Sequence, residues 1–96
     1  MIIRVDIDET ICERVNNSQY NNAIAIPGNI EKINKLHKEG HTIIYWTSRG
    51  MTTGIDWQEL TLSQLNEWGC LFHSLEMKKP YYDMIICDKS KRIEEI

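Results

Sequence analysis

Runs of branched apolar residues alternate along the chain with amphipathic stretches. The runs at 2–7 (Ile-Ile-Arg-Val-Asp-Ile) and 41–46 (His-Thr-Ile-Ile-Tyr-Trp) have the composition of buried strands. Between them, the stretch 27–40 begins with Pro-Gly-Asn and ends with Gly, which are signals for the start and the end of a helix. Its apolar stripe consists of Ile30, Ile33 and either Leu36 or His37. This order predicts a right-handed strand–helix–strand unit with parallel strands.

The second half of the chain repeats the pattern. A second helix is predicted from Asp56 as the cap, with Glu59 as its reciprocal partner, to Gly69. Two further apolar runs predict a third, edge strand at 70–75 and a fourth, buried strand at 84–87. The expected fold is therefore α/β, with a parallel sheet of about four strands and a charged tail that ends in a helical turn.

Length and composition limit the possible classes of protein. Ninety-six residues make one domain, 1–96, because the chain is too short for two cores. The apolar share of 42% and the charged share of 26% are typical of a soluble globular protein. The net charge of −3 argues against nucleic acid as a partner. No apolar run approaches the roughly 18 residues of a membrane span, so we expect a cytoplasmic protein without a membrane partner.

The cysteines and histidines do not have the spacing of a metal site. The three cysteines are odd in number and contain no Cys-x-x-Cys pair, and the three histidines share no ligand spacing. These residues are Cys12, Cys70, Cys87, His37, His41 and His73. We expect reduced thiols and surface or half-buried histidines.

Polar side chains with catalytic potential follow three of the predicted strands. They are Asp6 and Asp8 at the end of the first, Thr47, Ser48 and Arg49 after the second, where Gly50 follows, and Asp88 after the fourth. Because the carboxyl ends of parallel strands lie at one edge of an α/β sheet, we expect these residues to meet there. Two carboxylates so close repel and need a cation or a shared proton. Hydroxyl groups before a glycine offer donors and open backbone to a phosphate.

These features resemble, in order, the four motifs of the haloacid dehalogenase (HAD) superfamily. Asp6-x-Asp8-x-Thr10 resembles the first motif, Thr47 the second, Lys79 (with Lys78 as the alternative) the third, and Asp88 the fourth. The segments 40–50 and 79–89 look like a small capless subgroup of HAD phosphatases, often associated with capsular or surface polysaccharide biosynthesis. The resemblance covers nearly the whole chain. It implies a three-layer Rossmann-like sheet in the order 4-1-2-3, with no cap domain.

The resemblance also implies a HAD-type phosphatase, a Mg²⁺-dependent phosphomonoester hydrolase that works through an aspartyl-phosphate intermediate. The magnesium ion would be held by Asp6, Asp88 and the backbone carbonyl of Asp8. Asp6 would attack phosphorus, and Asp8 would protonate the leaving group and then activate water. The phosphoryl group would be bound by Thr47, Ser48 and Lys79. Arg49 would contact the phosphate or sugar of the substrate, or form an exposed ion pair.

Two features depart from the subgroup. Cys87 stands where its members commonly have a second acid, which predicts weaker metal binding or turnover. The chain also stops soon after the fourth motif and lacks the later strand of larger relatives. Without a cap, the site is expected to be open, shielded by the loop 11–26 and by a neighbouring subunit of a homo-oligomer. Candidate substrate contacts in that loop are Asn16, Asn17 and Tyr20.

The substrate is expected to be a small-molecule phosphate ester, and the subgroup favours a sugar phosphate of polysaccharide biosynthesis. An open site would admit bulky esters such as nucleotide-linked or lipid-linked sugars. Two alternatives stay open. One is a nucleotidase, and the other is a non-catalytic or regulatory phosphate-binding protein, which the replacement of an acid by Cys87 and the small size of the chain would suit.

Overall fold

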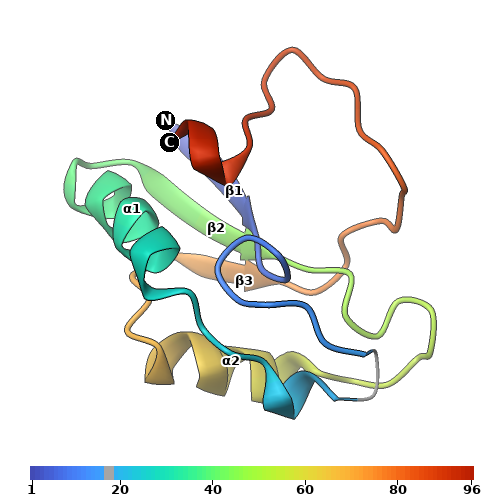
Figure 1. Ribbon diagram of the computed structural model, residues 1–96. Coiled ribbons are helices and arrows are strands. Elements are labelled where there is room, and N and C mark those ends of the chain that lie inside the picture. Colours follow the sequence, from blue (N-terminus) through green and yellow to red (C-terminus); the bar gives the residue numbers. More distant parts are fainter. Residues whose placement is uncertain (17–18) are drawn as a thin grey trace.

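A computed structural model describes residues 1–16 and 19–96, and in these residues three parallel strands form one sheet (Figure 1). The strands are β1 (Ile2–Asp6), β2 (Thr42–Trp46) and β3 (Ser74–Glu76), in the order β1-β2-β3. Asp6 pairs with Trp46, and Trp46 with Glu76, so that the three strands end side by side. The predicted strand–helix–strand unit is confirmed.

Two α-helices connect the strands. Helix α1 (Pro27–Lys38) begins at the predicted proline and ends before Gly40, which has a φ of 99°. Helix α2 (Gln58–Glu67) begins later than predicted, with Trp57 at its N-cap, although the Asp56 carboxylate accepts a hydrogen bond from the Gln58 amide at 3.0 Å. Short 3-10 helices occur at η1 (Tyr20–Asn22) and at η2 (Ile93–Glu95), the helical turn expected in the tail.

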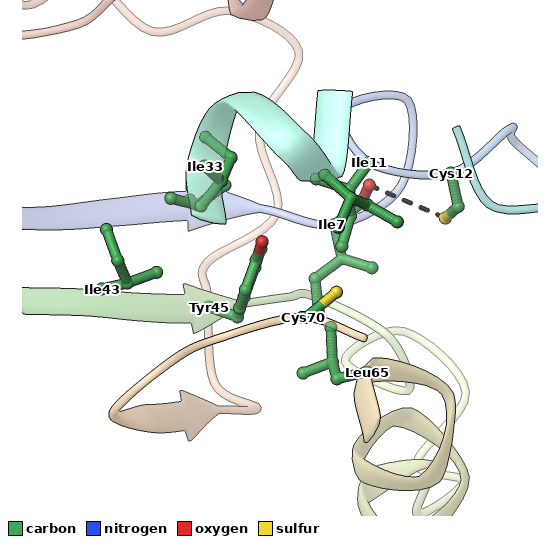
Figure 2. Close-up of a cluster of buried hydrophobic side chains, with 10 residues drawn as sticks. Ile7, Ile11, Cys12, Ile33, Ile43, Tyr45, Leu65 and Cys70 are labelled. Atoms are coloured by element: carbon green, nitrogen blue, oxygen red, sulfur yellow. Dashed lines mark hydrogen bonds between the residues drawn. The ribbon is translucent and has the colours of Figure 1, made fainter. Parts of the chain in front are cut away.

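Both α-helices pack on the same face of the sheet. Figure 2 shows Ile43 and Tyr45 of β2 in a cluster with Ile33 of α1 and Leu65 of α2. Val5 of β1 and Ile30 of α1 belong to the same cluster. A fully buried side chain of this size contributes about 1.5–3 kcal/mol to folding. In the part of the chain that the structure describes, no helix covers the opposite face, where Arg4 forms an exposed ion pair with Glu76 at 2.6 Å. The fold has two layers, and the predicted three layers are wrong.

The predicted fourth strand is also absent. Residues 84–87 have no regular structure and lie in a long excursion between β3 and η2 (Figure 1). The physical reason is the length of the connection. A parallel strand needs a crossover of about a dozen or more residues, whereas seven residues, 77–83, separate Glu76 from Met84. The predicted HAD-type sheet of about four strands in the order 4-1-2-3 is therefore wrong for this chain.

The third strand begins later than expected. Residues 70–73 of the predicted 70–75 strand are not in strand conformation. The side chain of Asn34 on α1 donates to the carbonyl of Gly69 at 2.9 Å and accepts from the amide of Leu71 at 2.8 Å. Because helix α1 holds this backbone, it joins the sheet only after His73.

The two ends of the loop 11–26 lie antiparallel to each other, with a bridge between Cys12 and Ala25. The Glu13 amide donates to the Ile24 carbonyl and the Ile26 amide to the Ile11 carbonyl, both at 2.8 Å. Asn17, one of the candidate substrate contacts in this loop, lies outside the described residues. Among the helices of the described residues, none is long and apolar enough to cross a membrane.

Candidate functional site

A tight turn follows β1 and presents the two acids. The amides of Thr10 and Ile11 both donate to the Ile7 carbonyl, at 3.1 and 2.9 Å. Glu9 takes a left-handed conformation with a φ of 65°, which is uncommon for a residue with a side chain. Ile7 and Ile11 are fully buried in the core shown in Figure 2. The buried isoleucines hold the turn in place, and the acids before and after Ile7 face the edge of the sheet.

Asp6 is paired with Lys79. The Lys79 ammonium lies 2.7 Å from Oδ2 of Asp6, and the Asp6 side chain is 42% exposed while that of Lys79 is 8% exposed. Burial lowers the pKa of Lys79, but its hydrogen bonds with Asp6 and Tyr82 outweigh burial, so the net direction is upward. The Lys79 amide also donates to the Thr47 carbonyl at 3.2 Å. A permanently charged lysine therefore stands beside an accessible carboxylate.

Asp8 is held by Arg49 through two hydrogen bonds. Nε of Arg49 donates to Oδ2 at 3.0 Å and Nη2 donates to Oδ1 at 2.9 Å. The Arg49 side chain is completely buried, and that of Asp8 is 23% exposed. A bidentate, charge-assisted pair of this kind fixes both the position and the plane of the carboxylate.

All five N–H groups of Arg49 have acceptors. Besides Asp8, Nη1 donates to Thr61 at 3.1 Å and to Gln64 at 2.6 Å, and Nη2 approaches the Cys12 sulfur at 3.9 Å. The guanidinium also lies over the Tyr20 ring, 4.6 Å from its centroid. The ion pair expected for Arg49 exists, but it is buried instead of exposed. In this arrangement Arg49 has no donor left for a substrate phosphate and acts on the site by positioning Asp8.

This buried polar network could not be predicted directly from the sequence. Thr61 and Gln64 lie on the buried face of α2 beside Leu65, and the Gln64 amide donates to the Tyr20 carbonyl at 2.6 Å. The feature of the sequence that could have indicated it is that Thr61 and Gln64, three residues apart, share a helix face with the apolar Leu65. Polar side chains on such a face are satisfied by a buried partner, here Arg49.

Thr47 and Ser48 lie between the two acid–base pairs. Thr47 is buried, and its hydroxyl oxygen accepts the Arg49 amide at 3.1 Å. Gly50 follows with a φ of 84°, and a side chain there would collide with the Ile55 carbonyl oxygen. The chain therefore needs glycine to bend away after Ser48, which leaves Ser48 at the surface of a cleft.

The cleft has a volume of about 580 Å³, within the usual range for small-molecule sites. Its lining is mostly polar and aromatic: Asp8, Arg14, Val15, Tyr20, Ser48, Thr52, Tyr81, Tyr82 and Asp83. Burial and then the Asp8 charge raise the pKa of Tyr20 above its ordinary value, so this phenol stays neutral. The cleft offers hydroxyl groups and rings beside a fixed carboxylate.

The structure brings together the predicted catalytic and phosphate-binding residues Asp6, Asp8, Thr47, Ser48, Arg49 and Lys79, but not Asp88, which is exposed in the excursion after β3. Of the candidate substrate contacts in the loop 11–26, Tyr20 lines the cleft and Asn17 lies outside the described residues. Among the described residues, no three acidic, histidine or cysteine side chains are close enough to hold a metal ion. Asp6 and Asp8 have the hard oxygen atoms that Mg²⁺ prefers, but Lys79 and Arg49 already occupy them. The donors of one copy therefore do not fit the three-residue magnesium site of Asp6, Asp8 and Asp88.

No known family model and no curated protein matches the chain. Among solved structures, the crystal structure of an MCSG target from Vibrio cholerae is similar, with a TM-score of 0.87 at 25% sequence identity. The alignment covers 99% of this chain and 86% of that chain. The similarity supports the fold, and membership of the HAD superfamily stays a prediction from the motifs.

Proposed function

We infer that the protein is a Mg²⁺-dependent phosphomonoester hydrolase of the HAD type that forms an aspartyl-phosphate on Asp6. The observation that carries this proposal is the convergence, at one sheet edge, of an accessible carboxylate paired with a buried lysine and a second carboxylate held by a buried arginine. Sequence separations of 41 and 73 residues make this convergence a product of the fold.

Asp6 suits the role of nucleophile. Its Oδ1 accepts the Ile7 amide at 3.0 Å, which fixes the carboxylate, and its exposed fraction leaves room for a phosphate. In the first step an Asp6 oxygen forms a bond to phosphorus and the bond to the ester oxygen breaks. Lys79 neutralises charge on both the nucleophile and the phosphoryl oxygens.

Asp8 suits the role of acid and base. To act as an acid, Asp8 must release one of the two oxygens that accept from Arg49 and take up a proton on it. That proton passes to the departing ester oxygen in the first step, and in the second step Asp8 takes a proton back from the water that attacks the acyl-phosphate. Arg49 holds Asp8 at the cleft wall during both steps. Thr47 and Ser48 lie where the phosphoryl oxygens would be bound.

Mg²⁺ would supply positive charge to the phosphoryl group when bound. One copy of the chain does not complete its site, so no step is assigned to the ion here. The substrate class we propose is a sugar phosphate, because the cleft combines hydroxyl groups with aromatic rings that suit a sugar. Tyr81 and Tyr82 would also suit a nucleobase, which makes a nucleotidase the second candidate.

The test measures phosphate release from an aryl phosphate, sugar phosphates and nucleotides, with Mg²⁺ and with a chelator. We expect Mg²⁺-dependent release that Asp6→Asn abolishes, and a hydroxylamine-sensitive phosphoryl group on the acid-quenched wild type. Glu13→Gln, in the exposed part of the loop 11–26, is the control and should retain activity. Full activity of Asp6→Asn would rule out the mechanism. Phosphate binding without release would instead support the non-catalytic alternative.

A further inference from the structure

The excursion after β3 carries an apolar segment with the pattern of a buried strand. We name residues 84–92 the arm. Met84, Ile85 and Ile86 are 76%, 50% and 92% exposed, and they are consecutive. Strands of parallel sheets that are buried on both faces have such continuous apolar runs, whereas a solvated loop does not. Exposed apolar runs of this kind mark interaction sites.

The arm cannot pair in parallel with β1 of its own copy. Lys79 is anchored to Asp6 at the C-terminal end of β1, and the four residues 80–83 extend at most roughly 17 Å from Lys79 to Met84. Running back along five residues of β1 takes about 13–16 Å, which uses nearly all of that reach and leaves too little chain to cross a face of the sheet. Antiparallel pairing within the copy is possible, but it would direct Asp88 away from Asp6.

The outer edge of β1 is open. β1 is the end strand of the sheet, and no strand of the described residues pairs with its other side. An open edge with free N–H and C=O groups is a template for another strand. Figure 1 shows the arm leaving at the C-terminal ends of the strands and returning toward the N-terminus of the chain. The arm thus runs antiparallel to β1 of its own copy. If a twofold axis makes the β1 strands of two copies antiparallel, each arm runs parallel to β1 of the other copy.

We propose that two copies of the chain exchange their arms, each arm pairing in parallel with β1 of the other copy. The exchange buries the three exposed apolar residues and covers the open edge of β1. It also places Asp88 of the partner subunit at the C-terminal end of β1, beside Asp6 and Asp8. The third carboxylate that one copy lacks is then supplied by the other. The exchange stands independently of the activity, while the catalytic role of the partner's Asp88 rests on the proposed function.

The first test measures molecular mass in solution by light scattering. The wild-type chain is expected at twice its 11.3 kDa, and Ile86→Asp at 11.3 kDa with an unchanged circular dichroism spectrum. Ile24→Asp, at another exposed isoleucine, is the matched control and should remain a dimer. A monomeric wild type, or a dimer that Ile86→Asp leaves intact, would overturn the exchange.

A second variant tests the connection directly and does not depend on disrupting the arm. Inserting about a dozen residues after Pro80 supplies the crossover that a parallel strand needs within one copy. The expected result is a folded monomer in which the amides of Ile85 and Ile86 exchange slowly with solvent. A lengthened chain that stays dimeric would contradict the argument from connection length.

The third test asks whether the partner's Asp88 completes the site. Asp6→Asn and Asp88→Asn chains are each inactive by expectation. When the two are unfolded and refolded together, half of the dimers are mixed, and one of their two sites holds both aspartates. About a quarter of wild-type activity should return. If the wild type is active and dimeric but the refolded mixture shows no activity, the composite site is ruled out. An inactive wild type that is nevertheless an arm-exchanged dimer would reject the proposed function alone.

Discussion

Strand β1 and the segment 84–88 have nearly the same local sequence pattern and opposite structures. Each is a short apolar run that leads into an aspartate, Asp6 in one case and Asp88 in the other. The first is paired in the sheet and the second is exposed to solvent. The difference lies in what the rest of the chain provides: β1 has a twelve-residue helix on its crossover, and the segment 84–88 has only the short connection from β3.

The two aspartates also differ in what holds the chain after the strand. The turn after β1 is anchored by buried isoleucines and by the pair between Asp8 and Arg49. Around Asp88 the contacts are local, such as the Ser90 hydroxyl donating to the Cys87 carbonyl at 3.2 Å. The comparison indicates that an acid at a strand end becomes part of a site only when long-range packing fixes the turn that follows.

The largest expected effect comes from removing the anchor of the first turn. Arg49→Met leaves Asp8, Thr61 and Gln64 without their buried partner. We expect a loss of about 3–5 kcal/mol in the free energy of unfolding, toward the lower end because Asp8 is partly exposed. Urea unfolding measures it. Arg4→Met, which breaks an exposed pair with Glu76, is the matched control and should cost less than about 1 kcal/mol. Equal effects would remove the distinction between the two arginines.

Matched truncations compare the two apolar runs directly. Ile7→Ala, in the core, is expected to cost about 2–5 kcal/mol. Ile86→Ala, measured at concentrations where the chain is a single copy, should change the free energy of unfolding by less than about 0.5 kcal/mol. A large loss for Ile86→Ala under those conditions would mean that the arm packs on its own copy.

Alkaline pH should loosen the turn after β1. Burial, then the Asp8 charge, raise the pKa of Cys12 from 9.0 to about 12, and burial raises that of Cys70 to about 11. Above about pH 9 the unfolded chain loses these protons first, so stability falls as pH rises, by up to about 1.4 kcal/mol per pH unit for each thiol. Unfolding between pH 8 and 11 measures this slope. Cys12→Ala should flatten it, and Cys87→Ala, at an exposed thiol, should not.

The smallest expected effect concerns the strained residue of the same turn. Glu9→Gly relieves a left-handed conformation that costs about 1 kcal/mol and loses only an exposed ion pair with Arg14. Glu9→Ala loses the same ion pair and keeps the strain. Thermal unfolding should therefore rank the glycine variant above the alanine variant by about 1 kcal/mol. The reverse order would show that Glu9 is not strained.

The parts of the fold that depend on local pattern could be predicted from the sequence. The apolar runs of β1 and β2, and the helix between them, follow from periodicity and end signals. The grouping of Asp6, Asp8 and Thr47 followed from the rule that parallel strands end at one edge, whereas Lys79 was expected there only from the resemblance. The fourth strand could not be judged in this way, because its local pattern is that of a strand and only the connection length forbids the pairing.

The role of Arg49 lay beyond prediction for a different reason. The sequence places it after a strand with other polar residues, which is typical of a substrate contact. Its burial depends on α2, whose Thr61 and Gln64 accept from it, and on Tyr20, whose ring covers it. Three segments distant in sequence must fold before the guanidinium is enclosed, and no single window of sequence contains that information.

The enclosed Arg49 has a consequence for how the protein can vary. Replacing Asp8 by a neutral residue would leave the buried Arg49 guanidinium without its carboxylate partner. Such a change would therefore lower the free energy of unfolding as well as the activity. A relative without the activity is then expected either to have replaced both Asp8 and Arg49 or to have kept both. The Asp8–Arg49 pair on its own is thus a poor marker of an active enzyme.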